Sequence, residues 1–356
     1  MGSRVIVVDD SALVRQELSS ILNDHGGLQV IGSAPHGVAA LELAEALKPD
    51  LITLDVQMPV MDGLTTLKHL MTRRPVATVM VSAFTRAESH VTFDCLRYGA
   101  LDFVEKPGGE HGVTLGETER TLVSRLRRAS RLDLPTPTYS RARVEASRSK
   151  VPDDRPAPGV LLVTGGLSGL GPVIQLLIGI PAGFMGAVVV CLDAHAAIVE
   201  SLASYLAALT PLAVRPFESG ETALLAGTAC FVPASASLMV LETGARPVLR
   251  SFPAPAGAER EAVTEALFTS VAQAFGRRAT AVLLSGSPRG TAAGVERVLE
   301  EGGRSLGQSP ETALEPEVLE LLSRRRLARS AGSVPDLLQI LFPASPETPL
   351  RAGSRP

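Results

Sequence analysis

This chain of 356 residues has few cysteines, a small net charge and no long apolar run. No apolar run is long enough to cross a bilayer, so we expect no membrane insertion. The three cysteines, Cys95, Cys191 and Cys230, are too few for a disulfide framework and predict reduced, buried thiols in a cytoplasmic protein. A net charge of −3 does not favour a nucleic-acid partner. The first strand is expected to begin almost at Met1, which leaves no room for a signal peptide.

The length predicts two domains, and a hydrophobic content of 45% is ample for two packed cores. The amino-acid composition changes near the middle of the sequence, where a segment rich in Pro, Ser and Arg shows no sustained apolar period. We therefore expect a first domain over residues 1–125, a Pro- and Arg-rich linker over 126–158, a second domain over 159–345 and a disordered tail over 346–356.

The first domain alternates short apolar runs with helical segments, a pattern typical of a parallel sheet covered by helices. The runs predict buried strands at residues 4–8, 51–54, 76–81 and 102–104. The segments between them predict helices at residues 11–22, 37–47 and 63–71.

Polar residues follow these predicted strands directly, and we expect them to meet at one edge of the sheet. They are Asp9, Asp10, Asp55, Ser82 and Lys106. Asp9 and Asp10 offer hard oxygen ligands for Mg²⁺, and Asp55 offers a carboxylate that can attack a phosphoryl group. The pattern predicts a phosphoryl-accepting pocket. Taken singly the residues have simpler explanations, since Asp pairs are common on surfaces and a Ser after a strand often caps the next helix.

Four segments of this domain resemble a two-component receiver domain, which has a flavodoxin-like fold. They are VVDDSALVR at 7–15, LDVQMPVMDGL at 54–64, VSAFT at 81–85 and GALDFVEKP at 99–107. The resemblance implies that Asp55 is the phosphoacceptor and that a histidine kinase is the phosphodonor. It also implies that Mg²⁺ is bound by Asp9, Asp10, Asp55 and the main chain of Gln57, and that the switch residues are Ser82, Lys106 and Phe103.

The second domain opens with a predicted strand at 160–163, a glycine-rich turn at 164–172 and a helical run at 173–178. Such a turn can cradle phosphate, bind a dinucleotide or expose a nucleophilic serine. The phosphate-loop interpretation fails because no Gly-Lys-Ser/Thr follows and no lysine occurs after Lys150. The dinucleotide interpretation is weak because the glycines do not form GxGxxG; only Asp193 could serve as its ribose-binding acid.

Six segments of the second domain resemble the catalytic domain of chemotaxis protein-glutamate methylesterases, the CheB-like family. They are GLSGLGP at 166–172, ESLASYL at 200–206, LLAGTACFVPASASL at 224–238, EALFTSVAQAFG at 265–276, VLLSGSPRGTAAGV at 282–295 and EGGRSLGQ at 301–308. The resemblance implies a mostly parallel α/β domain. It also implies that methyl-accepting receptors are substrates or partners, whose glutamate methyl esters are hydrolysed and whose glutamines are deamidated through a Ser-His-Asp triad.

Residue by residue, the resemblance implies an incomplete triad. Ser168 stands at the position of the nucleophile, Asp193 at the position of the histidine and Gly290 at the position of the aspartate. His195, two residues beyond Asp193, is the one histidine of this domain that could serve as a base. Because a serine hydroxyl needs an oriented base, such a loss typically lowers the rate by about four orders of magnitude.

Structural explanations of these residues stay open beside the catalytic ones. Ser168 could be a helix N-cap, His195 a surface residue and Asp193 the cap of the following helix. The second domain is then either a phosphorylation-gated hydrolase or a non-catalytic module that binds receptors or kinase, or drains phosphate from the kinase. A DNA-binding output is disfavoured because the sequence contains no compact helix-turn-helix with a basic face.

Overall fold

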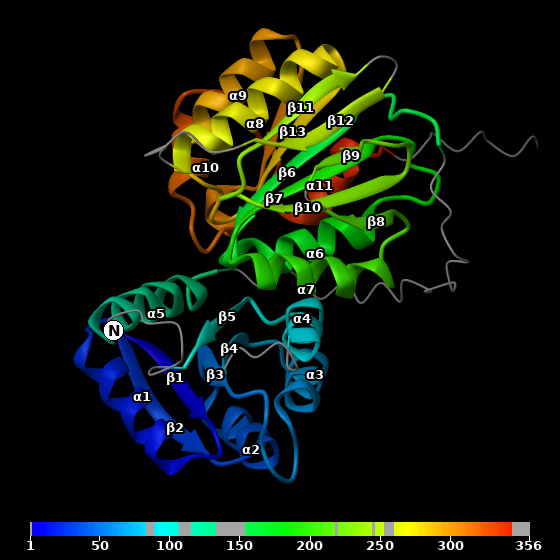
Figure 1. Ribbon diagram of the computed structural model, residues 1–356. Coiled ribbons are helices and arrows are strands. Elements are labelled where there is room, and N and C mark those ends of the chain that lie inside the picture. The colour runs from blue at the N-terminus through cyan, green and yellow to red at the C-terminus, as the bar shows by residue number, and fades with distance from the viewer. Residues whose placement is uncertain are drawn as a thin grey trace, which may run out of the picture.

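The computed structural model describes residues 2–82, 89–106, 115–132, 154–217, 220–243, 246–252 and 260–343. They form two α/β domains stacked one on the other (Figure 1). Most of the predicted linker, the predicted tail at 346–356 and residues 83–85 of the VSAFT motif lie outside the described residues. Within them no helix is long and apolar enough to span a membrane.

The first domain is a parallel five-stranded sheet in the order β2-β1-β3-β4-β5, which confirms the expected fold class. The strands are β1 (Ser3–Val8), β2 (Leu28–Ala34), β3 (Leu51–Leu54), β4 (Ala77–Ser82) and β5 (Asp102–Glu105). The helices are α1 (Ala12–Asp24), α2 (Gly37–Leu47), α3 (Gly63–Arg73), α4 (Ser89–Arg97) and α5 (Leu115–Ala129). The predicted strands and helices of this domain are all present, and β2, α4 and α5 are added to them.

Successive residues of the strands pack on opposite faces of this sheet, as the two-residue period of a strand requires. Val5 and Val7 of β1 belong to the core under α1 and α5. Ile6 and Val8 belong to the core under α2, α3 and α4. Both faces are therefore covered, which explains why the strands read as unbroken apolar runs.

The second domain is built on a parallel seven-stranded sheet in the order β15-β14-β13-β6-β7-β10-β8. Its strands are β6 (Val160–Gly166), β7 (Ala187–Asp193), β8 (Ala213–Pro216), β10 (Thr228–Pro233), β13 (Ala279–Leu283), β14 (Arg304–Gly307) and β15 (Arg329–Ser330). A small antiparallel sheet contains β9 (Glu221–Ala223), β11 (Leu238–Thr243) and β12 (Arg246–Ser251). The helices are α6 (Leu170–Gly179), α7 (Ala196–Ala207), α8 (Arg260–Phe275), α9 (Thr291–Glu300), α10 (Glu317–Arg324) and α11 (Val334–Leu341), with short 3₁₀ turns η1 (Leu167–Gly169), η2 (Gly276–Arg278) and η3 (Pro310–Thr312).

The glycine-rich turn is shorter than predicted, because β6 continues through Gly166 and α6 begins at Leu170, which leaves only η1 between them. The reason is a close approach of the backbone that follows β13. A Cβ on Gly166 would lie 2.6 Å from the carbonyl oxygen of Gly286, and a Cβ on Gly169 would lie 2.5 Å from that of Ser285. These glycines serve close packing of two loops rather than a long phosphate-binding turn.

The two domains share an apolar interface in which α4 packs against α6 and α7 (Figure 1). Phe93 on α4 is fully buried, and its ring lies 5.4 Å from that of Tyr205 on α7. The Tyr205 hydroxyl donates a hydrogen bond of 2.7 Å to Asp94 Oδ1. One core cluster runs from the α2–α4 side of the first domain to the α6 and α7 side of the second. The interface is therefore continuous with both cores.

The predicted buried thiols are confirmed: Cys95, Cys191 and Cys230 are free and buried. Burial raises the pKa of each thiol to about 12. They are consequently protonated and unreactive at neutral pH.

Shortening a side chain of α4 in the domain interface should lower the free energy of unfolding far more than shortening a side chain on the exposed face of the same helix. We expect Phe93→Ala to lower the free energy of unfolding by about 3 to 5 kcal/mol, because a large cavity is left between α4 and α7. Val91→Ala, at an exposed position of α4, is the matched control and should change it by less than about 0.5 kcal/mol. Denaturant unfolding of both variants measures this, and equal effects would contradict the packing described.

Candidate functional site

The carboxyl ends of β1, β3 and β5 bring the predicted acidic residues and Lys106 together. Asp9 follows β1 and Asp55 follows β3, and the two strands pair in register with Val8 opposite Leu54. The Asp55 backbone N–H donates to Val8 O at 2.9 Å, which fixes Asp55 beside the end of β1. The side chain of Ser82 lies outside what the structure describes, although its backbone, at the end of β4, pairs with Glu105.

Lys106 joins the two buried carboxylates. Its Nζ lies 2.7 Å from Asp9 Oδ2 and 2.9 Å from Asp55 Oδ2. Burial raises the pKa of Asp9, and the hydrogen bonds from Lys106 and from the Ser11 N–H offset this only in part. Burial would lower the pKa of Lys106, but hydrogen bonds to Asp55 and Asp9 outweigh it and the pKa is raised. The amine therefore stays charged at neutral pH.

Three carboxylates in this pocket fit a divalent cation. Ligand oxygens of Asp9, Asp10 and Asp55 all lie within 4.8 Å of one another, with Asp10 exposed and the other two buried. Carboxylate oxygens are the ligands that Mg²⁺ prefers, and the single lysine compensates only one of the three negative charges. This is an acidic pocket of the kind that holds Mg²⁺.

The loop after Asp55 folds tightly over the pocket, as Met58-Pro59 and Asp62-Gly63 indicate in the sequence. A Cβ on Gly63 would lie 2.1 Å from Asp55 O, so only glycine fits there. Asp62 caps α3 by accepting from the Thr65 N–H at 2.7 Å. The loop thereby holds Asp55 between the sheet and the start of α3.

Ser168 lies in η1, at the carboxyl end of β6, and is buried. Its hydroxyl shares a hydrogen bond of 2.8 Å with the hydroxyl of Ser285, which follows β13. The N-cap of α6 is Gly169 without a side-chain cap bond, so the alternative of Ser168 as that cap is wrong. Ser168 instead belongs to a buried cluster of hydroxyl groups between two strand ends.

The other residues predicted for this site stand at the ends of three elements: Asp193 at β7, His195 at α7 and Gly290 at α9. His195 is exposed and caps α7, its Nδ1 accepting from the Ala197 N–H at 3.3 Å, so α7 is capped by His195 and not by Asp193. Asp193 ends β7, with its backbone opposite Gly166. Gly290 has no room for a side chain, because its Cβ would lie 2.0 Å from Glu261 O.

Glu315 is a site residue that the sequence did not reveal. Its N–H donates to Ser285 Oγ at 2.9 Å, and its carbonyl accepts from the Gly286 N–H at 3.0 Å. The point where a Cβ on Gly286 would sit is 2.7 Å from Glu315 Oε2 and 2.8 Å from Ser168 Oγ, so the carboxylate and the serine face the same small space. No motif marks Glu315; only its loop places it there.

A buried ion pair of the first domain borders this site. Arg125 of α5 donates to Asp102 Oδ1 at 2.7 Å, and its Nε lies 2.6 Å from Asp102 Oδ2. The same Nε lies 3.7 Å from Glu315 Oε1. Burial is the main cause that raises the pKa of Asp102 to about 6, and the charge of Arg125 offsets part of this effect. β5, which carries Asp102, also lies close to η1.

Comparison with known proteins gives both domains a family. Residues 5–114 match the response regulator receiver domain, and residues 161–322 match the CheB methylesterase domain. The chain is 34% identical over 320 residues to a protein-glutamate methylesterase/protein-glutamine glutaminase of Geobacillus kaustophilus, which covers 87% of this chain and 89% of that protein. A relative of the same description from Dechloromonas aromatica is 35% identical over 312 residues, or 86% and 88% of the two chains.

The chain belongs to the protein-glutamate methylesterase/protein-glutamine glutaminase family. Among solved structures, the response regulator domain of Thermotoga maritima CheB is 38% identical, covers 37% of this chain and 99% of that one, and has a TM-score of 0.34. The family matches over residues 5–114 and 161–322 make the first domain the receiver and the second the methylesterase domain of this family.

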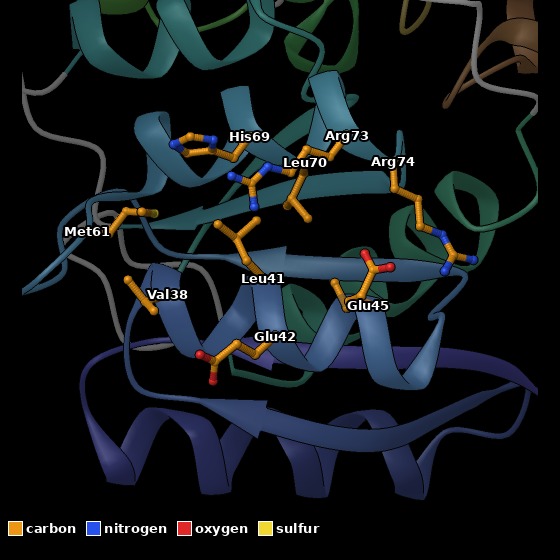
Figure 2. A pocket seen from close by; sticks show the side chains of 10 residues that line it. Val38, Leu41, Glu42, Glu45, Met61, His69, Leu70, Arg73 and Arg74 are labelled. Atoms are coloured by element: carbon orange, nitrogen blue, oxygen red, sulfur yellow. The ribbon is translucent and has the colours of Figure 1, made fainter.

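A groove of about 460 Å³ lies between α2 and α3 of the receiver (Figure 2). Glu42 and Glu45 of α2 line it on one side, and Arg73 and Arg74 at the end of α3 line it on the other. It includes none of the residues predicted for either site. It is therefore a surface feature of the receiver separate from the phosphoryl-accepting pocket.

The pKa of Asp102 predicts a pH dependence of stability. The pKa of the Asp102 carboxyl is higher in the folded state than in the unfolded chain. The folded state therefore binds more protons between pH values of about 4 and about 6. The contribution of Asp102 to the free energy of unfolding should therefore fall as pH rises through this window. Thermal unfolding of wild type and Asp102→Asn tests this, and the stability of wild type relative to the variant should decrease from about pH 4 to about pH 6 and then level off. A difference that rises across the window would contradict the assignment.

Proposed function

We propose that the protein is a response regulator phosphorylated on Asp55, with Mg²⁺ held by Asp9, Asp10, Asp55 and the main chain of Gln57. The observation that carries this proposal is the contact of Lys106 with Asp9 and Asp55. When bound, Mg²⁺ neutralises charge on the phosphoryl group. Asp55 provides the attacking oxygen, and the Lys106 ammonium binds an oxygen of the phosphorylated product. The donor is a histidine kinase of a chemotaxis-type pathway, and the location expected from the sequence is the cytoplasm.

Phosphorylation then changes the receiver surface through Ser82, Lys106 and Phe103. The added negative charge draws the Ser82 hydroxyl and the Lys106 ammonium toward it, and Phe103 in β5 changes position. The half-buried side chain of Phe103 packs against the core that continues into the second domain. The movement therefore alters the face that carries the methylesterase domain.

For the output we propose first a hydrolase that acts on receptor glutamate methyl esters and glutamine amides, with Ser168 as nucleophile. Its support is the buried Ser168 in a strand–turn–helix position, hydrogen-bonded to Ser285 and beside the receiver strand β5. Packing of the receiver against η1 keeps substrate from this serine in the unphosphorylated state.

The second candidate is a non-catalytic module that binds receptors or kinase, or drains phosphate from the kinase. The observations that favour it are the exposed position of His195 and the closed space at Gly290. Together with Asp193 at the family's histidine position, they support an incomplete Ser-His-Asp triad. A serine without an oriented base is a poor nucleophile.

Phosphate incorporation tests the receiver proposal. Asp55→Asn should abolish Mg²⁺-dependent phosphorylation by the kinase or by a small phosphodonor, since the amide cannot form the acyl phosphate. Asp24→Asn, at an exposed position of α1, is the matched control and should incorporate phosphate as wild type does. Chelation of Mg²⁺ should abolish incorporation in both wild type and control. Retained labelling of Asp55→Asn would place the phosphoacceptor elsewhere.

Methanol release from methylated receptors separates the two outputs. A hydrolase should release methanol once Asp55 is phosphorylated, and Ser168→Ala should lower that rate by about 10⁴-fold. Ser323→Ala, an exposed serine of α10, should leave the rate unchanged. Receptor binding without methanol release by any form would establish the non-catalytic module instead.

A further inference from the structure

The segment 310–316 of the methylesterase domain docks on the receiver. Leu314 is buried and belongs to the same core cluster as Val81, Val104 and Leu122 of the receiver. Arg128 of α5 donates to Ala313 O at 2.7 Å and also to Pro310 O. The segment is therefore held by apolar contacts and by hydrogen bonds to its backbone, all from β4, β5 and α5 of the receiver.

The same segment supports the serine site from the other side. Through its backbone, Glu315 donates to Ser285 and accepts from Gly286. Gln308 donates to Thr312 O at 2.8 Å and accepts from the Ser285 N–H at 3.2 Å. A displacement of the segment would consequently move Ser285, the hydrogen-bond partner of Ser168.

The hydroxyl pair can use one more acceptor. Two hydroxyl groups carry two hydrogens, and Ser168 and Ser285 use one of them in the bond between them. Ser285 Oγ also accepts a hydrogen bond from the Glu315 N–H, so this oxygen already has a donor other than Ser168. The second hydrogen needs an acceptor, and the Glu315 carboxylate faces the space into which Ser168 Oγ points.

Arg125 binds Asp102 more closely than it binds Glu315. Its contacts with buried Asp102 measure 2.6 and 2.7 Å, whereas the half-buried Glu315 carboxylate lies 3.7 Å away. Because separating a buried arginine from the buried carboxylate that it binds closely is costly, Arg125 should stay with the receiver when the domains move apart. Glu315 would then lose its positive neighbour while keeping its place beside Ser285.

We propose that Glu315 is a positioning residue for Ser168 and the point at which the receiver controls it. In the packed arrangement Arg125 holds the Glu315 carboxylate. When phosphorylation of Asp55 shifts β5 and its residue Asp102, Arg125 withdraws and the carboxylate accepts the hydrogen bond of the Ser168 hydroxyl, which makes that oxygen a better nucleophile. This inference rests on the proposed hydrolase role of Ser168.

The test measures labelling of Ser168 by a fluorophosphonate, a reagent that modifies nucleophilic serines without a receptor substrate. With Asp55 phosphorylated, Glu315→Gln should label about 10²-fold more slowly than wild type, because the amide keeps the size and the backbone contacts but is a weaker acceptor. Glu311→Gln, on the same segment, should label at the wild-type rate.

A second variant tests the part played by the receiver. Asp102→Asn combined with Arg125→Met removes both partners of the buried pair and so leaves no uncompensated charge. Without phosphorylation it should label Ser168 at least about tenfold faster than unphosphorylated wild type. Adding Glu315→Gln to it should return the rate to the low level.

The outcomes separate this inference from the proposed function. Equal labelling of wild type and Glu315→Gln in the phosphorylated state overturns the role of Glu315 and leaves Ser168 as the nucleophile. Failure of every form to label Ser168 overturns both the inference and the hydrolase, while phosphate incorporation at Asp55 stands on its own measurement.

Discussion

The ion pair of Asp102 and Arg125 is the contact on which the arrangement of the two sites depends. It joins β5, the strand that leads to Lys106, with α5, the helix that holds the segment 310–316 of the second domain. Removing one partner of such a buried pair typically costs about 3 to 5 kcal/mol, because the other charge is left without compensation. The pair therefore fixes β5 to α5 between the phosphoryl-accepting pocket and the domain interface.

The carboxyl ends of the two parallel sheets thus lie near the same strand of the receiver, β5. In the receiver that edge carries Asp9, Asp55 and Lys106; in the methylesterase domain it carries Ser168 and Ser285. β5 lies between the two edges, since it ends at the first pocket and runs close to η1. A small displacement of one strand can therefore reach both sites, and packed interfaces of this kind tend to switch between discrete arrangements.

The sequence predicted the receiver well, because its pocket is assembled from residues that directly follow buried strands. Asp9, Asp55 and Lys106 needed no knowledge of long-range packing beyond the convergence of parallel strands. The serine site was predicted only in part. Ser168 was marked by its glycine-rich turn, but Ser285 and Glu315 reach it through loops whose course no local pattern encodes. The glycine-rich turn was predicted too long for the same reason: Gly166 and Gly169 pack against a neighbouring loop at Ser285 and Gly286, which the local sequence does not reveal.

The closed space at Gly290 excludes an acidic side chain from that position. An aspartate there would require α8 to move, because the Cβ alone would meet Glu261 O at 2.0 Å. In this arrangement an acidic group must come from a different element, and the segment 310–316 brings Glu315 from the receiver side of the site. A carboxylate on that side of the site lies close to charged groups of the receiver, here Arg125. The closed space at Gly290 and the approach of Glu315 from the receiver side are therefore two aspects of the same geometry.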